Sequence, residues 1–191
     1  MTQPPTFRPH VLGIDDAPFD KRQPHPVPVV GVLMEGNDLV EGVALTHFPV
    51  DGGDATGFLA EWIRSLRFHE ALHAVVLGGI TMAGLGLVDI GVLAAEIGAP
   101  VLAVTRKATG RSRLGEALHA AGLPDRLPIV DRTPPAFRAA PGLYVACAGA
   151  EQAEAARLIQ ATIRKSRMPE PLRVAHLVAQ AVSRGQSVGH P

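Results

Sequence analysis

The sequence predicts an α/β protein with a mixed sheet, in which a three-strand antiparallel meander is followed by parallel strands, with helices on both faces. Two observations support this fold class. Three apolar segments lie close together near the N-terminus, separated by turn residues, as in an antiparallel meander. Continuous apolar runs then alternate with segments of helical periodicity, which is typical of parallel strands covered by helices.

The N-terminal half supplies the meander and the first crossover. The run HVLGI, which ends at Asp15, is short and apolar, so we expect a buried strand. Residues 27–36 and 39–50 form the next two strands, because the turn sequence GNDL separates them. Apolar residues recur at helical spacing over 58–66, and this helix leads into a strand, AVVLGG, at 74–79.

The C-terminal half alternates helices with apolar runs. We expect helices at 88–98, 113–122, 151–166 and 172–185, and strands at 100–106, 129–134 and 143–149. Three prolines in residues 1–9 predict a flexible tail, so residues 10–191 are expected to form a single domain.

Composition narrows the classes of protein to consider. Hydrophobic residues make up 47% of the chain, so a folded core is expected. The 18 basic and 18 acidic residues balance, so nucleic-acid binding would need a local patch. Cys147 is the single cysteine, which excludes a disulfide within the chain and suits the cytoplasm. The sequence shows no secretory signal pattern and no apolar run of the roughly 20 residues that a membrane span needs.

Two adjacent aspartates end the first apolar run, in the segment LGIDDAPF. A carboxylate at the end of a buried strand is costly unless hydrogen bonds or a cation offset its burial. Asp15 is therefore our principal candidate catalytic residue and metal ligand, for Mg²⁺ or Mn²⁺, because both ions prefer oxygen ligands. The alternative is a turn in which Asp15 accepts backbone N–H bonds, and the residues favour neither interpretation.

A metal site would need further acids. Asp54 and Asp89 are the other candidate catalytic residues, and Asp51 and Asp54 are the other candidate metal ligands. A divalent ion held there would polarise a phosphodiester and activate water for its hydrolysis. Structural interpretations compete: Asp54 stands where it would cap a helix, which we favour, and Asp89 would be an acid in the first turn of a helix.

The segment HEALH at residues 69–73 matches a zinc-peptidase signature, in which two histidines one helical turn apart bind the ion. A zinc-peptidase helix continues through both histidines, whereas a predicted strand follows here, and no third histidine stands at the extended spacing. We therefore favour the interpretation that His69 and His73 close a helix, and we rank a zinc peptidase third among the possible functions.

Basic residues cluster after the strand predicted at 100–106. Arg106, Lys107, Arg111 and Arg113 are the candidate nucleic-acid-binding residues, for DNA or RNA. A second cluster comprises Arg157, Arg164, Lys165, Arg167 and Arg173. The alternative, which the balanced charge favours, is that both clusters are solvated faces. In the last predicted helix, Arg173 and His176 share one edge, where we expect a packing role.

Several segments together resemble an uncharacterised endonuclease V-like family of prokaryotic proteins, a domain of unknown function. They are LGIDDAPF, VDGGDAT, VLGGITMAGLGLVDI, GAPVLAVTRK and MPEPLRVAHLVAQAV, and the resemblance runs from about Val11 to Gly189. It implies a ribonuclease H-like core, in which the first strand is central and carries a metal-binding aspartate at its end. The predicted order β-β-β-α-β-α-β is the order of that fold.

The resemblance to endonuclease V itself is partial. Gly13-Ile14-Asp15 is similar to the strand with the first metal aspartate of that enzyme. Gly78 stands where a second aspartate would be, and Ile63 where a glutamate would be. Two functions therefore stay open: a divalent-metal-dependent nuclease or nucleic-acid-binding protein, with Asp54 or Asp89 as substitute ligands, and a binding module that has lost the metal site. The sequence gives no oligomeric state.

Overall fold

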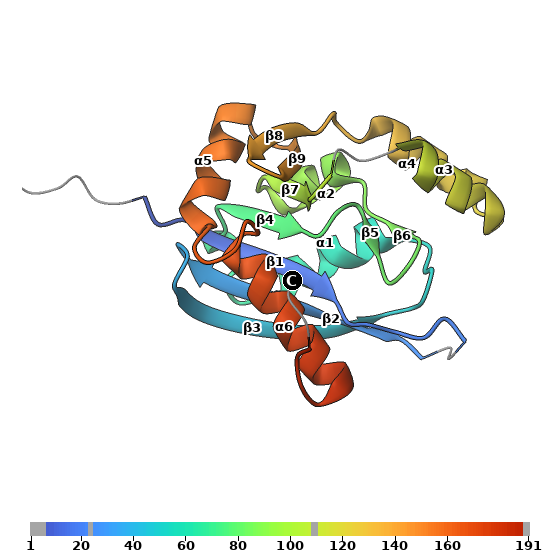
Figure 1. Cartoon of the computed structure of the whole chain (residues 1–191), viewed down its shortest axis with the longest axis horizontal. Coiled ribbons are helices and arrows are strands. Elements are labelled where there is room, and N and C mark those ends of the chain that lie inside the picture. Colours follow the sequence, from blue (N-terminus) through green and yellow to red (C-terminus); the bar gives the residue numbers. More distant parts are fainter. Residues whose placement is uncertain (1–6, 23–24, 108–110, 189–191) are drawn as a thin grey trace, which may run out of the picture.

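The computed structural model describes residues 7–22, 25–107 and 111–188, so residues 1–6 of the predicted tail lie outside it. Its centre is a seven-stranded mixed sheet in the order β3-β2-β1-β4-β7-β9-β8 (Figure 1). The strands are β1 (His10–Asp16), β2 (Val27–Glu35), β3 (Leu39–Phe48), β4 (Ala74–Leu77), β7 (Val101–Thr105), β8 (Phe137–Ala140) and β9 (Leu143–Ala148). β1 pairs antiparallel to β2 and parallel to β4, so the predicted mixed sheet with a central first strand is confirmed.

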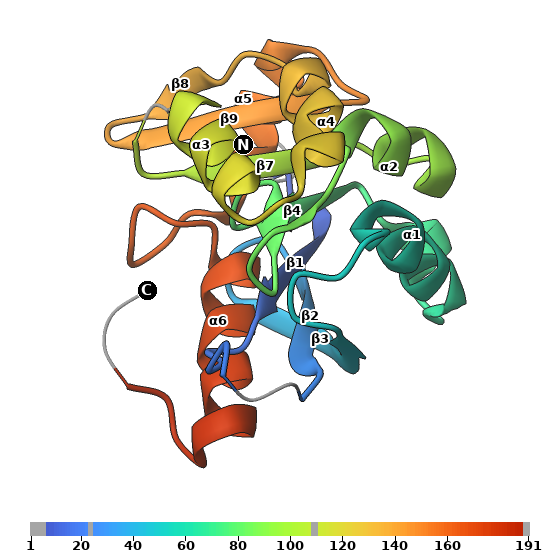
Figure 2. The ribbon, with the colours of Figure 1, turned by 90° about the vertical axis from the view of Figure 1, so that its right-hand side faces the viewer.

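Helices cover both faces of this sheet. They are α1 (Ala55–Ser65), α2 (Ile90–Ile97), α3 (Arg111–Ala120), α4 (Leu127–Arg132), α5 (Gln152–Thr162) and α6 (Glu170–Arg184). Short connections add the 3-10 turns η1 (His69–Ala71) and η2 (Pro124–Arg126) and a hairpin of β5 (Thr81–Met82) and β6 (Gly86–Leu87). Figure 2 shows α6 on one side of β1 and β2 and α1 on the other. None of the helices within the described ranges combines the length and apolarity that crossing a bilayer requires.

Consecutive residues of β1 join two different buried clusters, because strand side chains alternate between the faces. Val11 belongs to the cluster that includes Ile159 of α5 and Leu172 of α6. Leu12 belongs to the cluster that includes Leu59 of α1 and Leu93 of α2. β1 is therefore covered on both faces up to the point where its two aspartates emerge.

The last helix lies directly on β1 because residue 13 is a glycine. A Cβ atom at Gly13 would overlap the backbone of Pro171 and Leu172. No side chain separates the helix from the strand at this point, which only glycine permits. The contact fixes α6 relative to the end of β1, two residues further along the chain.

The strand predicted at 129–134 is wrong, because α4 covers Leu127–Arg132. Pro128 is in its first turn, a favoured position for proline in a helix. Val130 is the buried residue of this helix and packs in a small cluster with Leu87 and Leu118. A short apolar run does not distinguish a strand from a buried helix by periodicity. The last strand of the sheet, which pairs with β9, is β8 and not the segment at 129–134. We did not predict β8, because its four residues show no alternating pattern of burial.

Candidate functional site

The two adjacent aspartates lie at the carboxyl end of the central strand. Asp15 is paired with Val30 and Asp16 with Val29 of β2, so their side chains start on opposite faces of the sheet. Both carboxyl groups nevertheless line one small cavity of about 20 Å³, which Gly78 also lines. A cavity of this size accommodates about one water molecule, or an ion of similar size.

A histidine of the last helix holds Asp15. His176 Nδ1 lies 2.6 Å from Asp15 Oδ2, and His176 Nε2 lies 2.7 Å from Nε2 of Gln180, one turn further along α6. The backbone N–H of Val188 donates to Gln180 Oε1 at 2.6 Å. Because that N–H can only donate, the glutamine must present its NH₂ group to the imidazole. His176 therefore accepts at Nε2 and donates from Nδ1 to Asp15.

This chain of hydrogen bonds fixes both the tautomer and the orientation of His176. The hydrogen bond to Asp15 raises the pKa of His176 above its ordinary value. Gln180 opposes protonation, because an imidazolium would turn an Nε2–H toward the amide NH₂ group. The amide group of Gln180 could rotate to accept a hydrogen bond from His176 Nε2–H, but it would then lose the hydrogen bond that the N–H of Val188 donates to Oε1.

Asp16 carries the most perturbed carboxyl group of this site. Burial, and then the negative charge of Asp15, raise the pKa of Asp16 to about 6. A backbone hydrogen bond from Ala83 works in the opposite direction. A cation bound beside Asp16 would favour its ionised form and so offset both the cost of its burial and the repulsion from Asp15.

The next strand brings a glycine to the site instead of an acid. Gly78 follows β4, and a Cβ atom built on it would lie 3.4 Å from Asp15 Oδ1. A carboxylate at position 78 would therefore stand next to Asp15. The other departure from endonuclease V, Ile63 of α1, is fully buried in the apolar core. The structure thus brings Asp15 and Asp16 together beside Gly78, without a third acid at that position.

Asp54 and Asp89 each cap a helix. Asp54 Oδ1 accepts from the N–H of Gly57 at 2.8 Å and caps α1. Asp89 Oδ1 accepts from the N–H of Gly91 at 3.1 Å and caps α2. Asp89 Oδ2 accepts from Arg132 Nε at 2.9 Å. Asp54 therefore has the capping role that the sequence predicts. Asp89, which we expected within the first turn of its helix, caps that helix instead, because α2 begins at Ile90. The part of both aspartates in catalysis stays a prediction.

Asp51 lies in the loop before α1. Its Oδ1 accepts from the N–H of Leu85 at 2.7 Å and lies 3.6 Å from Lys21 Nζ. Within the ranges that the structure describes, no three of the four candidate acids bring one oxygen each within 4.8 Å of one another. A site that combines Asp15 with Asp51, Asp54 or Asp89 would therefore require a rearrangement of these loops.

The HEALH segment does not form a zinc-peptidase helix. Residues 69–71 form only a 3-10 turn, and Leu72 is already extended before β4. His69 Nε2–H donates to the carbonyl of Ile97 at 2.9 Å, and His73 Nδ1 accepts from the N–H of His10 at 3.1 Å. The two imidazoles serve separate local contacts, so the geometry favours the structural interpretation.

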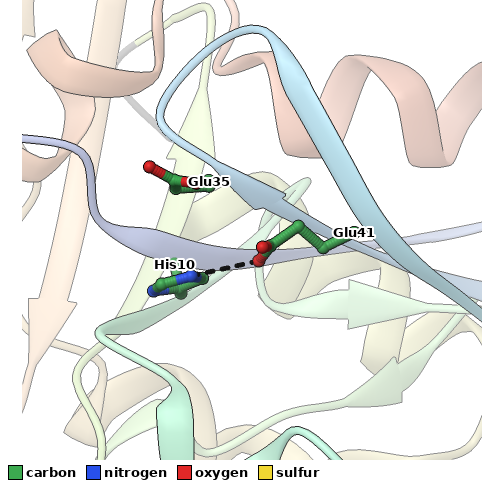
Figure 3. Close-up of side chains that lie close together, drawn as sticks. All are labelled: His10, Glu35 and Glu41. Atoms are coloured by element: carbon green, nitrogen blue, oxygen red, sulfur yellow. Dashed lines mark ion pairs between the residues drawn. The ribbon is translucent and has the colours of Figure 1, made fainter.

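A second group of ligand-type side chains lies at the opposite end of β1. His10, Glu35 and Glu41, from three neighbouring strands, bring one ligand atom each within 4.8 Å of one another (Figure 3). His10 Nε2 lies 3.1 Å from Glu41 Oε2, and Arg8 Nε lies 2.8 Å from Glu35 Oε1. Both carboxylates already have a basic partner, so ion pairs between neighbouring strands account for this group.

Arg106 is a predicted basic residue whose charge acts on the histidine bound to Asp15. It follows β7, and its positive charge partly opposes the rise in the pKa of His176 that the hydrogen bond to Asp15 causes. Arg106 also lines, with Gly142 and Arg167, a cavity of about 370 Å³, within the size range of ligand pockets. Lys107 and Arg113 are exposed, whereas the side chain of Arg111 lies outside the described part of the chain.

The sequence did not predict a functional role for His176, for which we expected a packing role. The available signal was weak: His176 and Gln180 are four residues apart, so they share one face of a helix. The packing of α6 on β1, which the missing side chain of Gly13 allows, brings that face to Asp15.

Comparisons with known proteins support the expected relationship. A family model described as endonuclease dU matches residues 8–183. A UPF0215 protein of Methanothermobacter thermautotrophicus is 36% identical over 183 residues, which cover 94% of this chain and 90% of the relative. The crystal structure of a protein of unknown function from Archaeoglobus fulgidus is 36% identical with a TM-score of 0.83, and the match covers 91% of this chain and 97% of that one.

Two endonuclease V structures share the fold at lower identity. The Streptomyces avermitilis enzyme is 18% identical with a TM-score of 0.61, covering 95% of this chain and 84% of its own. The Ciona intestinalis enzyme, crystallised with DNA containing an inosine, is 14% identical with a TM-score of 0.55, covering 88% and 82%. At these identities the likeness establishes the ribonuclease H-like fold, and function must be argued from the site.

Proposed function

Because the chain belongs to the endonuclease dU family, we propose that it is a divalent-metal-dependent endonuclease that cleaves DNA containing deoxyuridine. The placement of Asp15 carries this proposal. Its carboxylate ends the central strand, accepts a hydrogen bond from His176, and lies beside a second carboxyl group and a cavity of ionic size. The family description suggests the substrate class, and the geometry suggests the reaction class.

The residues at this end of β1 fit Mg²⁺ or Mn²⁺. Both ions take oxygen ligands, and Mg²⁺ is commonly held by one or two carboxylates together with water and phosphate oxygens. Asp15 and Asp16 provide two carboxyl groups, and burial, followed by the charge of Asp15, raises the pKa of Asp16, a cost that a bound cation would offset. A bound ion would polarise the phosphodiester and lower the pKa of a water molecule.

The protein side chains have separate roles in this proposal. His176 occupies Oδ2 of Asp15 and leaves Oδ1 on the side of Gly78, where the ion would be held. Arg106 and Arg167 line the larger cavity and would bind phosphate oxygens, for which the planar guanidinium group is suited. Asp54 and Asp89 would act mainly as caps that hold the two helices starting near the site.

The test is a cleavage assay on one oligonucleotide sequence that carries deoxyuridine, deoxyinosine or thymidine at a single position. Each substrate is offered both as a single strand and as a duplex, and each assay contains Mn²⁺, Mg²⁺ or EDTA. We expect metal-dependent cleavage of the deoxyuridine strand, and loss of cleavage in Asp15→Asn and Asp16→Asn. Asp54→Asn is the matched control, because asparagine caps a helix as well as aspartate does, so only the charge changes. Absence of cleavage by excess wild-type protein with every substrate and metal would refute the proposal.

A binding module that has lost the metal site is the second candidate, since Gly78 and Ile63 stand where acids are expected. It predicts that the protein binds the same oligonucleotides equally well with EDTA. It also predicts no thermal stabilisation by Mn²⁺, whereas a metal at 100 times its dissociation constant would stabilise the fold by about 2.7 kcal/mol.

A further inference from the structure

The hairpin of β5 and β6 forms one wall of the small cavity at the end of β1. Thr81 and Met82 of β5 line this cavity, as does Val88, which follows β6. The N–H of Val88 donates to the carbonyl of Ile80 at 2.9 Å, which closes the base of the hairpin. The position of the hairpin therefore decides the shape of the cavity.

The tip of the hairpin reaches Asp16. The backbone N–H of Ala83 donates a hydrogen bond to the Asp16 carboxyl group. Ala83 is fully buried and has a φ of 47°, in the left-handed region that residues other than glycine rarely adopt. Such a conformation persists only where the surrounding structure holds it. The hydrogen bond to Asp16 thus depends on the contacts that keep the hairpin in place.

Asp51 provides two of these contacts from the loop before α1. Its N–H donates to the carbonyl of Ala83 at 2.9 Å, and its Oδ1 accepts from the N–H of Leu85 at 2.7 Å. Asp51 also has a positive φ, of 52°. The two residues other than glycine that have a positive φ in the described ranges are therefore hydrogen-bonded to each other.

Arg126 of η2 binds the hairpin and this loop at once. Its side chain is buried, with 8% of the residue exposed. Nη1 donates to the carbonyl of Leu85 at 2.5 Å, and Nη2 donates to the carbonyl of Asp51 at 2.9 Å. Burying a guanidinium group is costly unless its hydrogen bonds offset the loss of water. Here those bonds join the hairpin to the loop of Asp51.

We infer that Arg126 is a positioning residue of the candidate site, which holds the hairpin so that Ala83 donates to Asp16. The inference rests on the proposed function, in which Asp16 provides one of the two carboxyl groups for the metal ion. Residues that orient a metal ligand through hydrogen bonds change the affinity for the ion without touching it. Arg126 acts in this way through the backbone of the hairpin.

Two other effects of Arg126 predict different results. Removal of a positive charge would by itself favour a bound cation, so a direct electrostatic effect predicts stronger Mn²⁺ binding in a variant without the guanidinium group. Release of the hairpin predicts weaker binding. A general loss of stability leaves the Mn²⁺ affinity of the folded protein unchanged. The direction of the change in affinity therefore separates the three explanations.

Calorimetric titration with Mn²⁺ measures this direction. Arg126→Ala should weaken Mn²⁺ binding about tenfold. Arg126→Lys should weaken it too, because lysine keeps the charge but lacks the planar fork that reaches two carbonyls. Ile159→Val is the control, since it lowers stability through the apolar cluster under α5, which contains no residue of the hairpin, and should keep wild-type affinity. Unchanged or stronger binding in the Arg126 variants, or an equal loss in the control, would overturn the inference.

Amide hydrogen exchange of the metal-free protein, followed by NMR, tests the hairpin itself. In Arg126→Ala the N–H of Ala83 should exchange about tenfold faster relative to that of Val75, because two hydrogen bonds from a charged group no longer oppose local opening. Val75 is a suitable reference, since its N–H donates to Pro100 in the centre of the sheet. An unchanged ratio would overturn the inference. If wild type bound no Mn²⁺, the proposed function would fail, and this exchange ratio would decide the role of Arg126.

Discussion

Replacing Asp16 with asparagine should stabilise the protein at neutral pH, because burial and the charge of Asp15 both disfavour the ionised carboxylate in the folded chain. Burial and Asp15 raise the pKa of Asp16 from 3.8 to about 6. A shift of about two units corresponds to about 3 kcal/mol. Well below pH 3.8 the group is neutral in both folded and unfolded chains. As pH rises from 4 to 6, the unfolded chain ionises first, so stability falls, and the full penalty applies above pH 6.

Urea denaturation followed by circular dichroism measures this effect. Asp16→Asn should exceed wild type in free energy of unfolding by up to about 3 kcal/mol near pH 7.5, with little difference near pH 4. Asp131→Asn, at an exposed position of α4, controls for the general effect of losing one carboxylate. Adding Mn²⁺ should stabilise wild type and leave Asp16→Asn nearly unchanged. A difference of the same size at both pH values would refute the reasoning.

Four further substitutions probe the site and its support. Gly78→Asp places a carboxylate beside Asp15 and should tighten Mn²⁺ binding measured by calorimetry, whereas unchanged affinity would argue against a metal at Asp15. Arg106→Ala and Arg167→Ala should each weaken DNA binding and reduce the slope of log K against log salt by about 0.9, and an unchanged slope would mean that the guanidinium group does not contact phosphate. Gly13→Ala should lower the free energy of unfolding by about 3 kcal/mol, because its Cβ overlaps the backbone of α6. A loss below about 0.5 kcal/mol would show that the helix simply moves away.

Features set by nearby residues were predictable from the sequence. The meander follows from apolar runs separated by turn residues, and the cap at Asp54 depends on an N–H group three residues away. The helix at 127–132 was not predictable, because its short apolar run fits a strand equally well.

For a related reason, the sequence predicted only one of the two residues, Asp15 and His176, that are hydrogen-bonded at the candidate site. Asp15 stood out because a carboxylate ends an apolar run, which is a local signal. The contact of Asp15 with His176 spans 161 positions and depends on which face of α6 meets β1. That choice follows from the missing side chain of Gly13, and no spacing within the last helix reveals it.

The direct contact between Gly13 and α6 also bears on protein synthesis. The ribosome makes Asp15 161 positions before His176. While the residues between them are made, Asp15 lacks the histidine that orients it. Whatever chemistry the aspartates support, a nascent chain cannot perform it in its final form before the last helix has left the exit tunnel and docked.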